Sequence, residues 1–426
     1  MLDLPNGWAV IPLKSAVFKA SVTNEIKIKQ RDYLSYGIFP VIDQGADFIG
    51  GYTNDEEKVV ACTLPAIVFG DHTKNVKFVN RRFCAGADGI KVMESPAFFH
   101  PKCLYYFICL LAKKIPDKGY ARHYQHLEKE TLPIPPLAEQ YRIVAKIDAL
   151  FSELDKGVET LQIIQQQLRM YRQAVLKWAF ESKEWERFTI EKFLTKNRRP
   201  MATGPFGTML KKHEHKQTGV PVLGIENIGQ GLFQHGNKIF VTPEKAKELK
   251  AFELHTNGVI ISRSGTVGEL CLVPEHMNGA LLSTNLMRVT LDENEILPRS
   301  FIYLFLSKGI VIDQVKELCK GSTRDFINQT ILKKIIFPLP PLQEQSLIIA
   351  EIESRLSICE KLAQIVDENL SKTQALKQSI LKKAFSGQLV PQDPNDEPAS
   401  ILLERIKAER KHSTVKAKTK GGRKSG

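Results

Sequence analysis

One stretch of this chain occurs twice. Residues 132–182 align without a gap with residues 337–387, at an offset of 205 positions, and 16 of the 51 aligned residues are identical. Eleven identities lie within 133–156 and five within 173–180. The offset is far longer than the 20–50-residue period of solenoid proteins. The repeat therefore predicts a duplicated globular region plus connector, and with it approximate two-fold symmetry within one polypeptide.

The repeated segment itself reads as a long helix. It opens with Pro-Pro-Leu-x-Glu-Gln, and proline suits the first helical turn. An apolar stripe then follows in alternating steps of three and four, interrupted by Gln165 and Arg172. Its members are Ile147, Phe151, Leu154, Val158, Leu161, Leu168 and Val175. This spacing predicts a coiled-coil seam. Roughly 43 helical residues would span about 65 Å, so the helix needs a partner, which the second copy supplies.

The predicted fold class is α+β. Two mixed α/β domains are joined by two long helices that pack as an antiparallel coiled coil with pseudo-two-fold symmetry. The expected parts are residues 1–131, connector helix 132–182, residues 183–336, connector helix 337–387, and a C-terminal short helix with a basic tail in 388–426. Within the first domain we expect strands at 59–62 and 66–69 and a buried helix in 98–111. The segment 119–124 aligns with 321–326 in the second domain.

The charge balance favours a polyanionic partner. The chain has 60 Lys and Arg against 47 Asp and Glu, a net charge of +13. Nucleic acid is the natural candidate for such an excess, and duplex DNA often binds partners with two-fold symmetry. A basic protein without such a partner is the open alternative. Residues 405–426 hold nine of the basic residues and one Glu, which predicts a disordered tail.

Several classes are disfavoured. No run of 18 apolar residues predicts a membrane span, and the N-terminus does not resemble a signal peptide, so we expect a cytoplasmic protein. The seven cysteines form no CxxC pair and no histidines have zinc-ligand spacing, so no metal site is expected. The chain lacks a GxxxxGK[ST] phosphate loop and the Asn/Asp-Pro-Pro-aromatic tetrapeptide of amino-methyltransferases. We therefore expect no catalysis by this chain.

The doubled connector resembles that of a known family. Each copy opens with Pro-[Leu/Ile]-Pro-Pro-Leu-x-Glu-Gln and closes with Gln-[Ala/Ser]-[Val/Ile]-Leu-Lys-x-Ala-Phe. Two variable globular regions that carry such connectors resemble the DNA specificity subunit of type I restriction-modification systems. The segment 384–392, followed by an expected helix over 399–410, fits the same family. The resemblance covers essentially the whole chain.

The resemblance implies a division of labour. Each globular region would be a target recognition domain that reads one half of a split, asymmetric DNA sequence, and the helices would set the distance between the halves. The partners would be double-stranded DNA, two modification subunits and two restriction subunits, with no membrane. The chain would bind no cofactor. S-adenosylmethionine would serve adenine methylation, and ATP and Mg²⁺ would serve DNA translocation and cleavage, all in the partner subunits. The location would be cytoplasmic, at the nucleoid when DNA is bound.

Polar residues after predicted strands are the candidate DNA contacts, because such side chains read base edges and phosphates. In the first domain these are Asp71, His72, Thr73, Lys74, Asn75, Arg122, His123 and Tyr124. In the second they are Lys211, Lys212, Arg263, Ser264, Thr266, Ser322, Thr323 and Arg324. Arg122 and Arg324 weigh most, since each follows the equivalent glycine and arginine is the usual reader of guanine. For any one residue, a merely solvated or ion-paired side chain is an equally open interpretation.

The two ends of the connector predict a further surface. A helix middle that only packs can drift in sequence, so the concentrated identities suggest that the ends dock equivalent partner subunits. The candidates are Pro136, Leu137, Glu139, Gln140, Pro341, Leu342, Glu344 and Gln345. Two other functions stay open. A nuclease or methyltransferase acting alone would show turnover without partners, and a structural coiled-coil or chromatin-organising protein would bind DNA without sequence preference.

Overall fold

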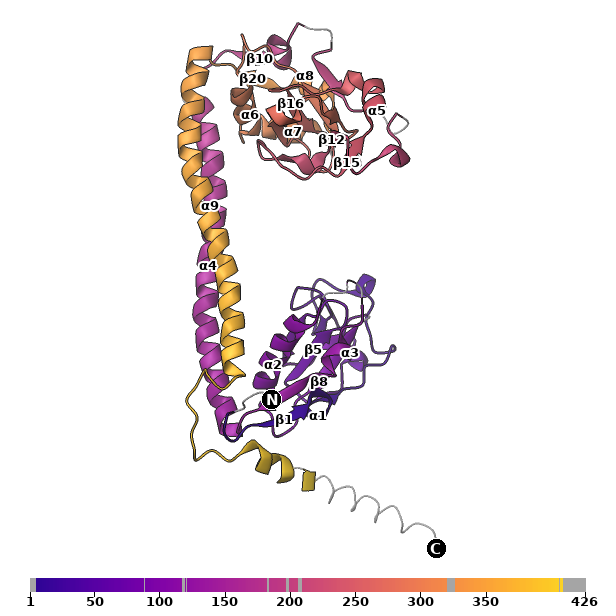
Figure 1. Cartoon of the computed structure of the whole chain (residues 1–426), viewed down its shortest axis with the longest axis vertical. Helices are drawn as coiled ribbons and strands as arrows, with labels where there is room; N and C mark the ends of the chain where they lie inside the picture. Colours follow the sequence, from indigo (N-terminus) through magenta and orange to yellow (C-terminus); the bar gives the residue numbers. More distant parts are fainter. Residues whose placement is uncertain are drawn as a thin grey trace. The chain divides into compact units, whose positions relative to one another are not determined.

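The structure, a computed structural model, describes residues 5–87, 89–116, 119, 121–181, 184–196, 199–205, 209–319, 326–405 and 407–408. It divides into two compact units (Figure 1). Unit 1 comprises residues 1–160 and 369–426, and unit 2 comprises residues 161–368. Each unit therefore contains a globular domain, one half of the first long helix and one half of the second.

Unit 1 is built on three small sheets. Its four-stranded sheet has the order β2-β8-β5-β6, its three-stranded sheet β4-β3-β7, and its two-stranded sheet β1-β9. The strands are β1 (Ala9–Pro12), β2 (Phe18–Lys19), β3 (Phe39–Ile42), β4 (Gly51–Thr53), β5 (Ala66–Gly70), β6 (Val76–Val79), β7 (Cys84–Ala85), β8 (Ile90–Glu94) and β9 (Thr131–Ile134). The helices are α1 (Leu13–Ala16), α2 (Pro101–Lys114) and α3 (Tyr124–Leu127). The parallel pair β3 and β7 brings the ends of these two strands to one edge.

Unit 2 repeats this topology strand for strand. Its sheets have the orders β11-β19-β16-β17, β15-β12-β18 and β10-β20, and β12 and β18 are again the parallel pair. The strands are β10 (Arg187–Thr189), β11 (Met201–Thr203), β12 (Val220–Leu223), β15 (Ile239–Val241), β16 (Val259–Ser262), β17 (Leu270–Leu272), β18 (Leu281–Leu282), β19 (Leu286–Val289) and β20 (Ile336–Pro338). The helices are α5 (Pro243–Glu248), α6 (Pro298–Leu306), α7 (Ile312–Cys319) and α8 (Gln329–Lys334). A hairpin of β13 (Ile228–Gly229) and β14 (Leu232–Phe233) has no counterpart among the described residues of unit 1.

Local sequence patterns predicted these domains only in part. The strand expected at 66–69 is β5 and the helix expected in 98–111 is α2, so both predictions are confirmed. The strand expected at 59–62 is wrong: Val59 forms only an isolated bridge to Cys84. A four-residue apolar run does not distinguish a strand from an extended loop that packs on the core.

The two long helices are α4 (Leu137–Glu181) and α9 (Leu342–Ala384). They pack antiparallel within each unit, as predicted (Figure 1). In unit 2, Gln165 donates a hydrogen bond to Asp367 at 2.7 Å. Seven residues further along α4, Arg172 forms an ion pair at 3.6 Å with Glu360, seven residues back along α9. The two polar interruptions of the predicted seam thus face polar partners on the other helix.

Each domain packs against the start of one long helix and the end of the other. The core of unit 2 includes Leu176 and Phe180, the last turns of α4. The core of unit 1 includes Leu381, at the end of α9, and Phe385, the residue after it. The Phe385 ring lies 4.6 Å, centroid to centroid, from Phe107 of α2 in an edge-to-face contact. The closing motif of the connector is therefore a packing motif in both copies.

The C-terminal segment returns to unit 1. The backbone N–H of Ala399 donates to the carbonyl of Gly7 at 2.8 Å, and Arg142 of α4 contacts Asp396 at 2.5 Å. Residues 399–405 are helical, and Ala399 and Leu403 join the apolar core. The tail predicted to be disordered lies almost entirely outside the described residues.

Candidate nucleic-acid interface

Several of the predicted DNA contacts lie where strands end, and the same backbone contacts build this place in both units. After the parallel strands, Gly86 N–H donates to Ile42 O at 2.9 Å, and Ser283 N–H donates to Leu223 O at 3.0 Å. After the hairpin strand, Asp71 N–H donates to Gly89 O at 2.5 Å, and Arg263 N–H to Asn285 O at 2.9 Å. We define loop cluster 1 as residues 43–47, 70–75 and 121–123. Loop cluster 2 comprises residues 224–227, 262–268 and 283–285.

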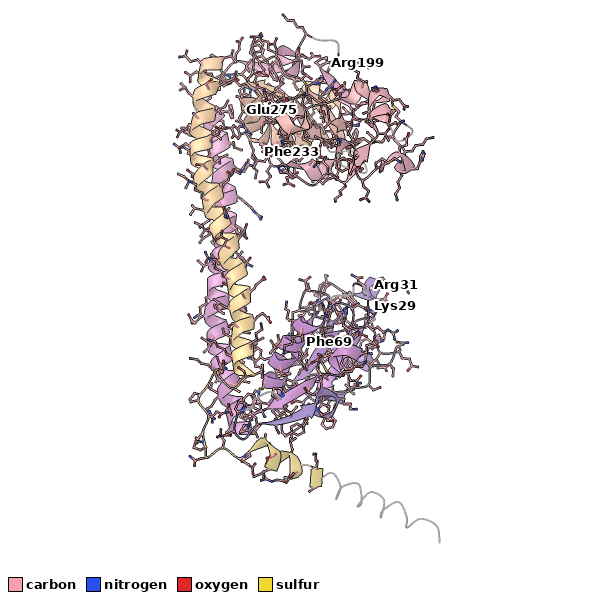
Figure 2. All side chains as sticks on the ribbon, viewed as in Figure 1. Lys29, Arg31, Phe69, Arg199, Phe233 and Glu275 are labelled. Carbon is pink, nitrogen blue, oxygen red and sulfur yellow. The ribbon has the colours of Figure 1, made fainter. Side chains whose placement is uncertain are left out.

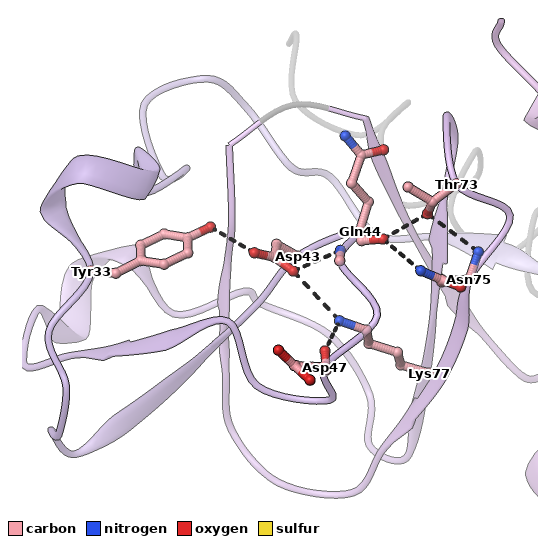
Figure 3. Close-up of polar contacts among 8 residues, drawn as sticks. Tyr33, Asp43, Gln44, Asp47, Thr73, Asn75 and Lys77 are labelled. Carbon is pink, nitrogen blue, oxygen red and sulfur yellow. Dashed lines mark hydrogen bonds and ion pairs between the residues drawn. The ribbon is translucent and has the colours of Figure 1, made fainter. Parts of the chain in front are cut away.

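A polar network holds loop cluster 1 together (Figure 3). The main-chain carbonyl of Gln44 accepts hydrogen bonds from Thr73 Oγ1 at 2.6 Å and Asn75 Nδ2 at 2.9 Å. Lys77 is 5% exposed, and its Nζ lies 3.5 Å from Asp43 Oδ1 and 2.5 Å from the carbonyl of Asp47. Burial lowers the pKa of Lys77, and Asp43 opposes that shift. The network fixes the hairpin turn against the loop that follows β3.

Three predicted contacts in unit 1 are buried instead. Asp71, His123 and Tyr124 are 5%, 0% and 5% exposed. Asp71 Oδ1 accepts the backbone N–H of Tyr124 at 2.7 Å, and the carbonyl of Asp71 accepts the backbone N–H of His123 at 2.8 Å. Asp71 fixes the start of α3, and all three side chains are buried away from the surface that DNA could reach. We correct the prediction accordingly and remove them from the candidate surface.

The remaining candidates of unit 1 lie at the surface of loop cluster 1. Thr73 and Arg122 are exposed, while His72, Lys74 and Asn75 are half-buried. Nδ1 of His72 lies 3.1 Å from the carbonyl of Ala121, which joins the hairpin turn to the segment that carries Arg122. Lys74 has a φ of 60°, a conformation that the tight turn imposes. The DNA contacts proposed for these five residues remain predictions.

Arg263 is the central residue of loop cluster 2. Its guanidinium stacks 4.5 Å from the ring centroid of Phe326, and Nη1 donates to the carbonyl of Thr284 at 3.2 Å. Burial lowers its pKa, and its Nε is buried without a hydrogen-bond partner among the described residues. The stack holds the guanidinium in one plane, which suits an arginine that presents two parallel N–H groups to a base or phosphate.

Two other candidates support this loop. Ser264 Oγ donates to Asn285 Oδ1 at 3.2 Å, and Thr266 Oγ1 to Ser262 Oγ at 3.0 Å. Thr266 is exposed and Ser264 half-buried. Thr266 is thereby anchored to Ser262, which is fully buried, whereas Ser264 pairs with the exposed Asn285.

The pairing of Arg122 with Arg324 is wrong by two positions. The carbonyl of Asp71 accepts the N–H of His123, and the carbonyl of Arg263 accepts the N–H of Ile327. His123 thus corresponds to Ile327, and Arg122 to Phe326. Ser322, Thr323 and Arg324 lie outside the described residues, so their contacts remain predictions.

Lys211 and Lys212 are exposed and lie at the 3-10 turn η4 (Lys212–Glu214). Unit 1 has a 3-10 turn at the same place, η1 (Gln30–Asp32), flanked by Lys27 and Lys29. Sequence reasoning missed this second turn. Aligning Gly37 with Gly219, each of which precedes the strand of the parallel pair, would have revealed it.

The repeated Glu-Gln pair has a role inside the chain. Gln140 accepts the backbone N–H of His100 at 2.7 Å and donates to the carbonyls of Phe98 and Pro135 at 3.2 and 3.0 Å. Gln345 does the same, accepting the N–H of Leu297 at 2.8 Å and donating to the carbonyls of Glu295 and Pro340 at 3.1 and 2.8 Å. His100 and Leu297 are the N-cap residues of α2 and α6. We call this arrangement the glutamine latch.

The partner-docking prediction is corrected for the buried members of the pair. Gln140 and Gln345 are both 0% exposed, Glu139 is 1% exposed, and Pro136 is buried. Glu139 accepts a hydrogen bond from Trp8 Nε1 at 2.9 Å, and burial raises its pKa. Leu137 and Glu344 are half-buried, and Pro341 and Leu342 are exposed. For those four residues docking remains a prediction.

A second shared contact ties each domain to its long helix. In unit 1, Asp148 of α4 binds Lys102 Nζ at 2.7 Å and the hydroxyl of Tyr106. In unit 2, Glu353 of α9 lies 3.5 Å from Arg299 Nε and accepts from the Tyr303 hydroxyl at 3.3 Å. Burial, together with the carboxylate, raises the pKa of Tyr303 to about 12. Both units thus join a basic side chain and a tyrosine hydroxyl to a carboxylate of the long helix, although the basic and acidic residues differ.

The structure shows no group of three or more metal-ligating side chains among the described residues. In the same part of the chain, no helix has the length and apolar character needed to span a membrane.

Comparisons with known proteins agree with this architecture. Residues 5–164 and 182–366 match the family model of the type I restriction modification DNA specificity domain. The chain is 25% identical over 473 aligned positions to the Type I restriction enzyme EcoBI specificity subunit of Escherichia coli, covering 96% of this chain and 94% of that one. It is 27% identical to the StySPI specificity subunit of Salmonella potsdam, covering 96% of both chains.

A solved structure described as "Structural basis underlying complex assembly and conformational transition of the type I R-M system" contains a chain of similar fold. The match has a TM-score of 0.64 at 18% identity and covers 91% of this chain and 99% of that one. The family model accounts for most of the sequence in two separate segments, one for each globular domain. The chain therefore belongs to the type I restriction modification DNA specificity domain family and carries that domain twice.

Proposed function

We propose that this chain is the sequence-reading subunit of a type I restriction-modification complex and that each unit reads one half of a bipartite, asymmetric DNA site. One observation carries the proposal. The two loop clusters share their backbone frame but differ in their side chains: Asp71 caps a helix where Arg263 presents a stacked guanidinium. Two domains that share a backbone frame but carry different side chains would dock on DNA in the same way and read two different base sequences.

The long helices support a fixed spacing between the half-sites. α4 is a single helix from Leu137 to Glu181, and a helix keeps its length where a flexible linker would not. Half-sites about one helical turn apart, roughly 34 Å, lie on one face of the duplex. A fixed number of base pairs between the half-sites is therefore part of the proposal.

Catalysis belongs to partner subunits in this proposal. Two modification subunits would methylate adenine with S-adenosylmethionine, and two restriction subunits would use ATP and Mg²⁺. This chain would bind DNA and assemble those subunits around it. It would act in the cytoplasm and would bind no cofactor of its own. The repeated architecture supports two copies of each partner, because it offers each partner two similar docking sites.

Base-modification sequencing of DNA from cells that express this chain with its modification subunit tests the proposal. The expected result is a single bipartite motif with methyl-adenine in both halves and a constant spacer. Arg263→Ala should weaken sequence preference, measured by methylation, in the half-site that unit 2 reads. Sequence preference in the other half-site should stay intact. An assembled complex without any motif would overturn the proposal, and turnover on DNA by the purified chain alone would favour a stand-alone enzyme.

A further inference from the structure

Two basic turns occupy the same place in the two units. Basic turn 1 comprises residues 27–32 and contains Lys27, Lys29 and Arg31. Basic turn 2 comprises residues 211–214 and contains Lys211 and Lys212. Each includes a 3-10 turn, and each leads through a short loop into the central strand of the three-stranded sheet.

The same backbone contacts fix both turns. In unit 1, Leu34 and Tyr52 exchange two backbone hydrogen bonds of 2.9 Å. In unit 2, Lys216 and Phe240 exchange the corresponding pair at 2.8 and 3.2 Å. Gly37 and Gly219 follow, and a side chain on either would press on the neighbouring strand, at Thr53 O and Val241 O. The turns are therefore ordered and structurally equivalent, although their sequences differ.

Basic turn 1 adjoins loop cluster 1. Ile28 N–H donates to the carbonyl of Ala85 at 2.9 Å, at the strand end where loop cluster 1 is built. The hydroxyl of Tyr33, directly after the turn, donates to Asp43 Oδ2 at 3.3 Å (Figure 3). The lysines and the arginine thus flank the loops that carry the candidate base contacts.

The positive charge of both turns is largely uncompensated. Lys29 and Arg31 are exposed and lie at the surface of unit 1 (Figure 2). Arg31 has one weak contact with Asp32, 3.6 Å between two exposed side chains, and Lys27 Nζ binds the neutral amide oxygen of Asn24 at 2.9 Å. In basic turn 2 the one carboxylate, Glu214, is paired at 2.8 Å with Lys245 outside the turn. Lys211 and Lys212 therefore keep their charge available to an external anion.

From this arrangement we infer that the basic turns are the phosphate-contacting element of each domain, and that they position the loop clusters on the duplex without reading its sequence. The inference rests on the proposed function and adds a division of labour within each unit. Phosphate contacts fix the register of a protein on DNA, whereas base-edge contacts specify sequence. Charge at a fixed place with unrelated sequence is what such a positioning element requires.

The test uses the assembled complex of this chain with its modification subunits. One variant carries Lys27→Gln, Lys29→Gln and Arg31→Gln, and another carries Lys211→Gln and Lys212→Gln. Charge-matched controls lie in other segments of the same unit: Lys14→Gln, Lys114→Gln and Lys129→Gln in unit 1, and Lys308→Gln and Lys334→Gln in unit 2, all exposed. Affinity is measured against salt for a duplex that carries the methylated motif and for a scrambled duplex of equal length.

Each lost phosphate contact should reduce the slope of log K against log salt by about 0.9, so the triple variant should lose up to about 2.7 and the double variant up to about 1.8. Affinity for both duplexes should fall by the same factor, and the methylated motif should stay unchanged. A slope equal to that of the control variants would overturn the inference, as would a changed motif. A wild-type complex that does not distinguish the two duplexes would instead overturn the proposed function.

Discussion

At the residue scale, the repeated glutamine shows what a repeat in sequence can mean. Gln140 and Gln345 each use both amide N–H groups and the carbonyl oxygen inside their own unit. The sequence marks both positions as important but does not distinguish a glutamine that docks a partner from one that is buried. Two of the three hydrogen-bond partners of each glutamine lie 40 to 50 residues away, and no local pattern contains that information.

Gln345→Ala should destabilise unit 2. It would leave the N–H of Leu297 and the carbonyl of Glu295 without partners, and unsatisfied buried groups cost about 1–3 kcal/mol each. We expect the free energy of unfolding to fall by roughly 2–6 kcal/mol, measured by denaturant titration. Gln343→Ala, exposed at the start of the same helix, is the matched control and should change little. Unchanged stability together with lost partner binding would restore the docking interpretation.

Glu139→Gln should remove a pH dependence from unit 1. Burial raises the pKa of Glu139 above 4.5, so the folded state binds its proton more tightly than the unfolded state. Its contribution to stability is therefore fully present below pH 4.5 and is lost as the pH rises through the raised value. The stability difference between variant and wild type should shift in favour of the variant between pH 4 and neutral pH. A difference independent of pH would show that the carboxyl of Glu139 titrates normally.

At the element scale, the ends of the long helices belong to different domains. The start of α4 packs in unit 1 through Ile143 and Ile147, and its end packs in unit 2 through Leu176 and Phe180. The closing motif recurs because each helix end must fit the same kind of core. This intramolecular packing accounts for three of the five identities within 173–180, those at Leu176, Ala179 and Phe180.

Phe180→Ala should therefore loosen unit 2. Removing a fully buried phenylalanine costs about 3–5 kcal/mol, and Phe180 is 2% exposed in the core of unit 2. Hydrogen exchange should become faster in α6 and β16 and stay unchanged in β5 and β8 of unit 1. Met170→Ala, on the same helix at 65% exposure, should affect neither unit. Faster exchange confined to unit 1 would contradict this assignment of the helix end.

How well each element could be predicted depended on its length. The helices α4 and α9 have 45 and 43 residues, long enough for the three-four spacing to identify them and their seam. The strands have two to five residues, too few for a period, so an apolar run such as 59–62 cannot be told from a strand by sequence alone. The candidate residues in loops were the hardest to predict. The equivalence of His123 with Ile327 follows from hydrogen bonds between distant segments, and sequence similarity does not show it.

At the scale of the whole molecule, the two units are not two consecutive halves of the sequence. Unit 1 contains both ends of the chain and unit 2 contains its middle. Gly7 and Ala399 are joined by a backbone hydrogen bond of 2.8 Å, so the described parts of the two ends lie close together. A chain with adjacent ends can in principle be opened elsewhere without loss of its contacts.

A circular permutant tests whether the order of the repeats matters. The chain is truncated after residue 408, joined to Pro5 by a short Gly/Ser linker, and opened between Glu181 and Glu184. This opening lies between the end of α4 at Glu181 and the start of β10 at Arg187, so it interrupts no described helix or strand. We expect a melting temperature within a few degrees of that of the truncated linear chain, and the same bipartite motif and spacer in base-modification sequencing with the modification subunit.

A permutant opened between Lys156 and Gly157 is the control: it breaks α4 and should lose the motif. If the first permutant folds as well as the linear chain but methylates with another spacer, then the link between α4 and β10, and not the paired helices, sets the distance between the half-sites.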